Sequence, residues 1–337
     1  MPSMLPTSFQ FFKLKEVEWK VIRAIPRSLT ITEVARRAGI PQYRVSRVLS
    51  RLKEKTKISF EVDFRRLGIT PMAVLTSTSP SPNIPFLRAV RVVRFLGRKS
   101  YLVSGLVPEE FIDDWLAYFK SDRYVIRALE RAWWDPEKAV ATAYVNGWIV
   151  GNLEVLRGVE NLIVSQGTRL TPKDRVPLDE ADLAILMVKM SWAFNSLRKA
   201  EKDKNILKYI GRRISHQALS RHYRKHVLRV WRGNRVRLYR SLVEVPYMLM
   251  YLEGRSAGLI ARLLVQLPWF HTAYIDLGRA LVSGQPPCSS LLPLMQLFDE
   301  YEVYMPLGEI LMEPSLQKYV PDTLILRDIV KMKVRER

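Results

Sequence analysis

The sequence predicts an α+β fold in which two winged helix-turn-helix domains alternate with two ferredoxin-like αβ-sandwich domains, as an internal duplication. Segments 39–47 and 213–221 match, each with an Ile at the turn and a Ser-Arg pair further on. A second match follows in the same order, because Leu-Val-Ser-Gly occurs at 102–105 and again at 281–284. Two independent matches at nearly the same offset indicate a repeated unit.

The repeat divides the chain into two copies of one unit. The expected parts are a first winged helix-turn-helix at 1–66, a ferredoxin-like domain at 67–157, a linker at 158–176, a second winged helix-turn-helix at 177–241 and a second ferredoxin-like domain at 242–337.

Turn and capping residues place the elements of the first winged helix. Apolar residues recur at helical spacing over 13–24, which predicts the first helix. Thr30 or Thr32 is a suitable cap for a second helix, and Gly39 can end it in the left-handed conformation of a tight turn. Pro41 starts a third helix, and the alternation over 58–64 predicts a strand.

The second winged helix repeats this order. Its first helix is expected to start at Leu178, and residues 214–229 hold the turn and the third helix. Residues 230–239 surround Gly233-Asn234, a pair typical of a tight hairpin turn. We therefore expect a hairpin there, with its tip as the wing.

Each sandwich domain follows the pattern strand, helix, strand, strand, helix, strand, which is typical of the ferredoxin-like fold. The central strands of the two copies are expected to turn at Gly97 and Gly278. The helix between the first two strands looks short in the first copy. A further hairpin is expected around Asn146-Gly147.

The composition favours a polyanionic partner. Lys and Arg number 54 against 33 Asp and Glu, a formal net charge of +21. The single cysteine, Cys288, excludes a disulfide within the chain and a four-thiolate zinc site. The first residues lack a signal-peptide pattern, and the long uncharged runs are short or interrupted by Pro. We expect a cytoplasmic protein with no membrane partner.

The order of parts resembles the Lrp/AsnC family of transcription regulators, in a tandem form such as archaea carry. Residues 178–186 read Leu-Asp-Glu-Ala-Asp-Leu-Ala-Ile-Leu, which is similar to the family's opening motif, and 60–69 is similar to its passage from wing into AsnC-type sandwich. The resemblance implies DNA binding and a homodimer through the ferredoxin-like domains. The acidic signature that follows the hairpin glycine in that family is replaced by Arg98-Lys99 and by Arg279. Binding of a small-molecule effector therefore stays open.

The faces of the two recognition helices that their apolar stripes leave free are the expected DNA-binding surfaces. Arg and Gln can read base edges with two hydrogen bonds, whereas Ser and Tyr more often bind phosphate. The residues expected to contact DNA are Gln42, Tyr43, Arg44, Ser46, Arg47 and Arg51 from the first head, His216, Gln217, Ser220, Arg221, Arg224 and Lys225 from the second, and Arg232, Arg235 and Arg237 from the second wing.

No catalytic residues, cofactor or metal are expected. His222 and His226 have the spacing of metal ligands, but no Cys lies nearby and no Glu holds the HExxH position. Packing or DNA-facing roles are favoured for both histidines. The sequence has no Gly-rich phosphate loop, GxSxG motif or Cys-His pair with catalytic spacing, so we expect that the chain is not an enzyme.

The main hypothesis is a sequence-specific regulator that binds double-stranded DNA as an intrachain pseudo-dimer. Because the two heads differ in sequence, they would read two unlike half-sites. One alternative is an architectural or RNA-binding basic protein. Another is an enzyme on the same scaffold, because the sirohaem decarboxylases resemble Lrp/AsnC proteins in architecture yet act on tetrapyrroles. The sequence specifies neither the target nor the oligomeric state.

Overall fold

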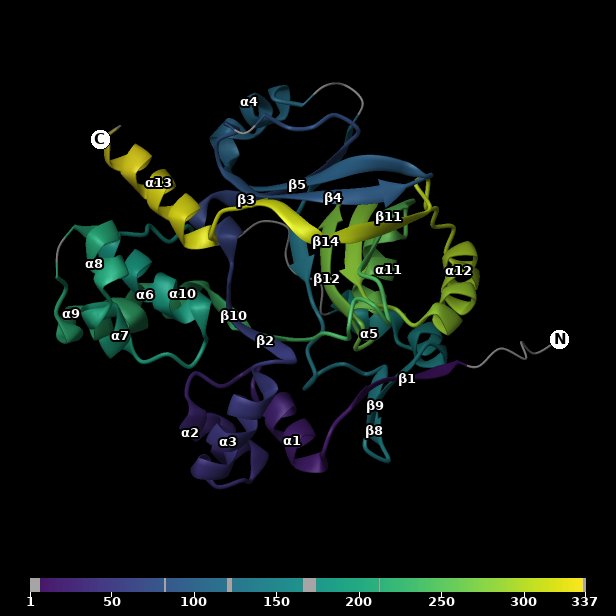
Figure 1. The fold of residues 1–337 in the computed structure, drawn as a ribbon, viewed down its shortest axis with the longest axis horizontal. Coiled ribbons are helices and arrows are strands. Elements are labelled where there is room, and N and C mark those ends of the chain that lie inside the picture. Colours follow the sequence, from purple (N-terminus) through teal and green to yellow (C-terminus); the bar gives the residue numbers. More distant parts are fainter. Residues whose placement is uncertain (1–6, 82, 120–122, 166–173, 212, 336–337) are drawn as a thin grey trace.

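The computed structural model describes residues 7–81, 83–119, 123–165, 174–211 and 213–335. It is a mixed α+β fold built around one curled antiparallel sheet, with two helical lobes below and beside it (Figure 1). Among the helices of the described ranges, none is long and apolar enough to cross a membrane.

The central sheet has nine strands, and its two halves use the same strand order. When the strands of each half are counted along the chain, their order across the sheet is fourth, first, third and second. The halves join edge to edge through the pair β4 and β14. In spatial order the strands are β6 (Arg123–Arg127), β3 (Ile69–Thr76), β5 (Arg98–Pro108), β4 (Leu87–Phe95), β14 (Glu309–Tyr319), β11 (Met248–Glu253), β13 (Arg279–Gly284), β12 (Phe270–Asp276) and β7 (Glu130–Ala132).

The sheet curls so that its inner face forms a core of its own. Leu75 and Leu102 from the first half pack with Leu249, Tyr251 and Leu281 from the second. At the closing edges the backbone N–H of Arg127 donates to the carboxylate of Asp276, at 3.0 Å. This curvature brings side chains from both halves to one interior.

Helices cover the outer face of the sheet. Trp115 of the helix after β5 is buried against β3 and β5 in a separate apolar cluster. In the second half a helix connects the first and second strands. The described residues of the same connection in the first half contain no helix, where the sequence predicted a short one. The helices beside the sheet are α4 (Ile112–Ala117), α11 (Ala257–Leu264), α12 (Leu291–Glu300) and α13 (Asp322–Arg335), with short 3-10 turns at Glu109–Phe111 and Cys288–Ser290.

The first lobe, shown in purple at the bottom of Figure 1, contains α1 (Glu16–Ala24), α2 (Ile31–Ala38) and α3 (Gln42–Leu52). The Thr30 hydroxyl accepts a hydrogen bond from the N–H of Glu33, and so caps α2. Gly39 ends α2 with φ of 65°, the left-handed conformation expected from the sequence. Strand β2 (Thr56–Val62) follows, and residues 64–67 form a 3-10 turn, Phe64–Leu67, instead of continuing the strand.

The second lobe is longer and less regular. Its helix after the turn has a π-helical segment at Tyr223–Val227, within the range 214–229 that was predicted to hold the turn and one third helix. The elements of this lobe are α6 (Glu180–Ser191), α7 (Leu197–Lys202), α8 (Lys204–Ile210), α9 (His216–His222), the π-helical turn η4 (Tyr223–Val227) and α10 (Leu228–Val230).

The prediction of a hairpin over 230–239 is wrong. Residues Trp231–Leu238 form one strand, β10, which pairs with β2 of the first lobe. Gly233 has φ of 128° and lies at a register shift, so it makes a bulge instead of a turn. The Asn234 amide donates to the carbonyl oxygens of Ile25 and Ser28, which fixes it inside the molecule.

A small ribbon completes the fold. The hairpin predicted at Asn146-Gly147 is confirmed, with φ of 50° and 85° at the turn. Its strands are β8 (Thr142–Val145) and β9 (Trp148–Asn152), and β1 (Ser8–Lys13) adds to β9. The chain then forms a 3-10 turn at Glu154–Gly158 and helix α5 (Glu160–Ser165). Residues 166–173 of the expected linker lie outside the described residues.

Candidate anion-binding pocket

A cavity of about 370 Å³ opens between the inner face of the curled sheet and strand β10. Its lining combines apolar and hydroxyl side chains of the sheet with an unusual number of arginines. These arginines are Arg88 and Arg91 of β4, Arg131 of β7, Arg235 and Arg237 of β10, and Arg240 just after β10. The six come from both halves of the sheet and from the inter-lobe strand, so only the complete fold assembles the pocket.

The local pattern of β10 explains its contribution. Arg235 and Arg237 are two residues apart, so they project from the same face of the strand. Because β10 is anchored to β2 and at Asn234, this face is turned toward the sheet. The Arg235 guanidinium also donates to the hydroxyl of Thr272 on β12, at 2.8 Å.

Glu61 of β2 is the buried counter-charge for two of these arginines. Its carboxylate lies 2.9 Å from Arg131 and 2.8 Å from Arg235, and it accepts a hydrogen bond from Ser59 at 2.7 Å. Burial alone would raise the pKa of Glu61, but Arg131 and Arg235 hold that pKa well below its usual range. Glu61 is therefore a fixed anion.

Arg88 links α13 to the pocket floor. It forms a two-point ion pair with Asp322, at 2.6 and 3.1 Å, and donates to the hydroxyl oxygen of Tyr274 at 3.1 Å. Burial acts to raise the pKa of Tyr274, but Arg88 and Arg131 lower it below the ordinary value. The Tyr274 phenol is therefore a better proton donor than a free tyrosine.

Arg91 and Arg237 form no ion pair among the described residues, although the charge of Arg237 does help to lower the pKa of Glu61. Within the described residues, neither has a carboxylate partner, and the buried Nε of Arg237 has no hydrogen-bond partner. Burial lowers the pKa of Arg91, and burial together with Arg237 lowers the pKa of Arg235. Burial is the largest cause of both shifts, and a bound anion would stabilise the charged form of either arginine.

Carboxylates are scarce on the cavity wall. Among the described residues that line it, the only one is Glu313, which pairs with Arg94 at 2.9 Å. A second cavity of about 250 Å³ shares Arg88, Arg131, Arg235 and Arg237 with the first and adds Lys57. Burial, followed by the neighbouring Arg237 and Arg235, lowers the pKa of Lys57 as well.

A neutral histidine lies behind the cationic lining. His271 donates from Nε2 to the carbonyl of Leu238 at 2.8 Å, and its Nδ1 lies 3.3 Å from the hydroxyl oxygen of Tyr247, which donates to Ser283. Burial, with Arg237 nearby, lowers the pKa of His271 to about 3. His271 therefore lies beside Tyr247 without adding charge.

The structure places the residues expected to face DNA in two different settings. Those on the recognition helices are at the surface. Gln42, Tyr43, Arg44, Arg47 and Arg51 are exposed on or at the end of α3 with Ser46 half-buried, and His216, Gln217, Arg221, Arg224 and Lys225 are exposed on α9 and η4 with Ser220 half-buried. DNA contact by these residues stays a prediction.

The three arginines of the expected wing face inward, which corrects their assignment. Arg235 is only 3% exposed, and Arg237 lines the cavity. Arg232 donates to the carbonyl of Arg131 at 3.0 Å and lies over the ring of Trp133. The reason is the strand pairing of β10, because a paired strand has no free tip to present to phosphate.

Sequence reasoning missed most of the pocket. Arg88, Arg91 and Arg94 interrupt an otherwise apolar strand, and that interruption was the available signal. Arg131, Tyr274 and His271 gave no comparable signal, because they converge only through the curl of the sheet.

Comparison with protein-family models and with curated proteins finds no match to this chain. Two solved structures resemble it, those of the siroheme decarboxylase NirDL alone and in complex with an iron-uroporphyrin III analogue. Their TM-scores to this chain are 0.47 and 0.46, and the sequence identity is 12% in both cases. Each match covers 94% of this chain and, respectively, 99% and 98% of the other chain. Neither structure is of a transcription regulator, so the tandem archaeal regulator stays a prediction. The expectation that the chain is not an enzyme runs against these two matches, because both are structures of an enzyme.

Proposed function

We propose that the chain is an enzyme that binds an organic polycarboxylate in the arginine-lined pocket and removes a carboxyl group from it. The observation that carries this proposal is that two of the six arginines in the wall, Arg91 and Arg237, have no ion pair among the described residues, whereas the other four pair with Glu61, Asp322 or Glu244. Arginine binds carboxylate with two parallel hydrogen bonds, and Arg91 and Arg237 have none of their donors committed to a carboxylate of the described chain.

The apolar part of the wall fits a ligand with a ring body and acidic edges. Leu102, Leu249 and Leu281 come from the sheet strands β5, β11 and β13, whereas the arginines come from β4, β7, β10 and the residues just after β10. Ligand sites typically combine such an apolar lining with a few placed polar groups. A cyclic tetrapyrrole with several carboxylate side chains has this chemistry, and an enzyme acting on one was among the sequence-based alternatives.

The pocket also holds a group suited to the proton step. In decarboxylation the bond between the carboxyl carbon and its neighbour breaks, carbon dioxide leaves, and the electron pair left on carbon takes a proton. Tyr274, held by Arg88 at 3.1 Å with its pKa lowered, is the proposed donor. Arg91 and Arg237 would hold the other carboxylates of the substrate.

Absorbance titration with uroporphyrin III tests the binding step. We expect saturable binding by the wild-type protein and a loss of about 10-fold or more in affinity for Arg237→Gln, because charged hydrogen bonds contribute roughly 1.5–3 kcal/mol. Arg279→Gln is the matched control, since Arg279 is exposed at a hairpin end and lies outside the cavity. Equal affinities of the two variants would contradict the proposal.

Mass spectrometry of siroheme incubated with the protein tests the reaction. Stepwise loss of carbon dioxide, retained binding in Tyr274→Phe and slowed loss in that variant would support the assignment. Tight binding with no loss of carbon dioxide from siroheme or uroporphyrin III would refute the enzymatic proposal and leave a ligand site.

Sequence-specific binding to double-stranded DNA is a second candidate. The observation that favours it is the outer face of α3, where Tyr43 is 70% exposed beside Arg44 and Arg47. Selection from a random duplex pool at about 150 mM salt tests it, because non-specific phosphate contacts weaken at that ionic strength. An enriched motif supports a reader of two unlike half-sites, whereas sequence-independent retention supports an architectural or RNA-binding protein.

A further inference from the structure

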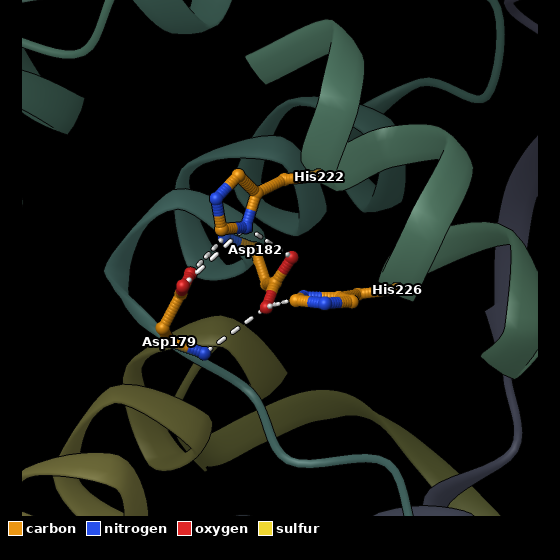
Figure 2. A group of neighbouring side chains, drawn as sticks. All are labelled: Asp179, Asp182, His222 and His226. Carbon is orange, nitrogen blue, oxygen red and sulfur yellow. Dashed lines mark hydrogen bonds and ion pairs between the residues drawn. The ribbon is translucent and has the colours of Figure 1, made fainter. Parts of the chain in front are cut away.

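Four side chains of metal-ligand type meet in the second lobe, away from the arginine-lined pocket. Figure 2 shows Asp179 and Asp182 at the start of α6, with His222 at the end of α9 and His226 on η4. One potential ligand atom from each residue lies within 4.8 Å of all the others. None of the four lines the cavity described above.

Hydrogen bonds at the start of α6 set the orientation of the two carboxylates. Asp179 Oδ1 accepts from the N–H of Asp182 at 3.0 Å, and Asp182 Oδ2 accepts from the N–H of Asp179 at 3.1 Å. This reciprocal arrangement is a capping box. It leaves Asp179 Oδ2 and Asp182 Oδ1 turned toward the Nδ1 atom of His222, at 3.4 and 3.2 Å.

The two imidazoles converge on the buried carboxylate. Asp182 is 0% exposed, whereas His222 and His226 are 15% and 26% exposed at their side chains. His226 Nδ1 lies 3.1 Å from Asp182 Oδ2, and the two rings are 5.1 Å apart. His226 belongs to the π-helical turn, an irregularity that is frequent at functional sites.

A carboxylate withdrawn from water needs a compensating cation or donor. Asp182 is fully buried, and its two oxygens lie beside the N–H of Asp179 and the Nδ1 atoms of His222 and His226. Its neighbours are two imidazoles and the carboxylate of Asp179. The two carboxylates repel each other unless a positive charge lies between them.

We propose that Asp179, Asp182, His222 and His226 form a binding site for one divalent transition-metal ion, with zinc as the best match. Zinc takes imidazole nitrogen and carboxylate oxygen in tetrahedral geometry at about 2.0–2.2 Å, which places neighbouring ligand atoms roughly 3.4 Å apart. The separations from His222 to the two carboxylates, 3.2 and 3.4 Å, already have this size. The capping-box N–H groups orient the carboxylates, as hydrogen bonds around a metal site commonly do.

The proposed ion would join parts of the lobe that are distant in sequence. It would clamp the start of α6 to the π-helical turn, and so fix the helix that carries Arg221 on its exposed side. This site is independent of the proposed decarboxylation, so failure of either proposal leaves the other intact.

Titration of the chelator-treated full chain with Co²⁺ alone, followed by competition with Zn²⁺ alone, tests the site. We expect one Co²⁺ per chain, visible absorption of a low-symmetry four-coordinate ion, and displacement of that signal by Zn²⁺. The thermal midpoint should rise with either ion, because a ligand that binds only the folded state stabilises it. Absence of stoichiometric Co²⁺ uptake by the folded wild-type protein would overturn the proposal.

Variants then assign the ligands. His222→Ala and His226→Ala should lower Zn²⁺ affinity by at least about 100-fold, the upper end of what removal of a merely supporting group causes. His216→Ala is the control, because His216 is exposed on α9 outside the cluster. Asp182→Asn keeps a side-chain oxygen for the capping box. A loss of Zn²⁺ affinity in this variant can therefore be distinguished from a loss caused by unfolding. Undiminished binding in folded His222→Ala or Asp182→Asn would refute the ligand assignment.

Discussion

The guanidinium of Arg235 lies 2.8 Å from the carboxylate of Glu61, and both side chains are buried between the two lobes. Arg131 binds the same carboxylate from the sheet, at 2.9 Å. One anion therefore holds two cations, one from the inter-lobe strand and one from the far edge of the sheet. Glu61 ties the wall of the pocket to the lobes.

Glu61→Gln should be strongly destabilising. Removal of one partner from a buried ion pair leaves uncompensated charge and typically costs about 3–5 kcal/mol. We expect a loss of that size in the free energy of unfolding, measured by urea denaturation, with partial recovery on addition of a polycarboxylate ligand. Glu54→Gln, at an exposed position, is the control and should change the free energy by less than about 0.5 kcal/mol. A loss below about 1 kcal/mol for Glu61→Gln would contradict the assigned role.

His271 should make the fold acid-sensitive. Its pKa is lowered to about 3 in the folded chain, whereas the pKa of a histidine in an unfolded chain is about 6.5. The unfolded state therefore binds more protons between these values, and stability from this group is lost as pH falls through that window. The loss between pH 6.5 and pH 4 should be about 3 kcal/mol, at roughly 1.4 kcal/mol per pH unit.

His271→Gln tests this pH dependence. The amide of Gln can still donate to the carbonyl of Leu238, but it does not titrate. Denaturation midpoints measured from pH 7 to pH 4 should fall less steeply for His271→Gln than for wild type. His216→Gln, at an exposed site, should retain the wild-type slope. Parallel profiles for wild type and His271→Gln would show that His271 is not the titrating group.

Local patterns in the sequence were sufficient to predict several turns and helices of the fold. The turn at Gly39 and the hairpin at Asn146-Gly147 depend on backbone conformations that their residues favour, and both are present. Gly233-Asn234 has the same local preference, yet pairing with β2 and the buried amide contacts of Asn234 turn it into a bulge. Tertiary contacts decided that case, and a single-segment pattern does not contain them.

The candidate pocket was less accessible to sequence reasoning for a related reason. Arg235 and Arg237 were noticed, but as surface residues, because basic side chains near a predicted turn are usually solvated. Their actual surroundings depend on Arg88, Arg131 and Tyr274, which approach them only when the sheet curls. His222 and His226 were noticed as well, and the carboxylates beside them come from a helix about 40 residues earlier.

The repeated Leu-Val-Ser-Gly segments have a packing reason to end in glycine. A Cβ atom at Gly284 would lie 2.1 Å from the carbonyl oxygen of Trp269, and one at Gly105 would lie 2.7 Å from the Trp115 ring. The backbone clash at Gly284 cannot be relieved by rotating a side chain. Gly284→Ala should therefore lower the thermal midpoint more than Gly105→Ala, with a loss of several kcal/mol. Gly158→Ala is the control, because its Cβ would meet no atom within 4 Å. Equal midpoints for the Gly284 and Gly158 variants would contradict the strand geometry.

The two exposed helix faces should act separately if the chain reads DNA. Arg47 of α3 and Arg221 of α9 belong to different lobes, so each would contact its own half-site. After a motif has been selected, Arg47→Ala and Arg221→Ala should each cost about 1–3 kcal/mol and relax specificity at different base positions. Binding isotherms on single-base variants of the motif measure this. Arg235→Ala serves as the contrast, because its buried side chain should change stability without altering base preference. Relaxation at one shared position by both surface variants would show that the heads do not read separate half-sites.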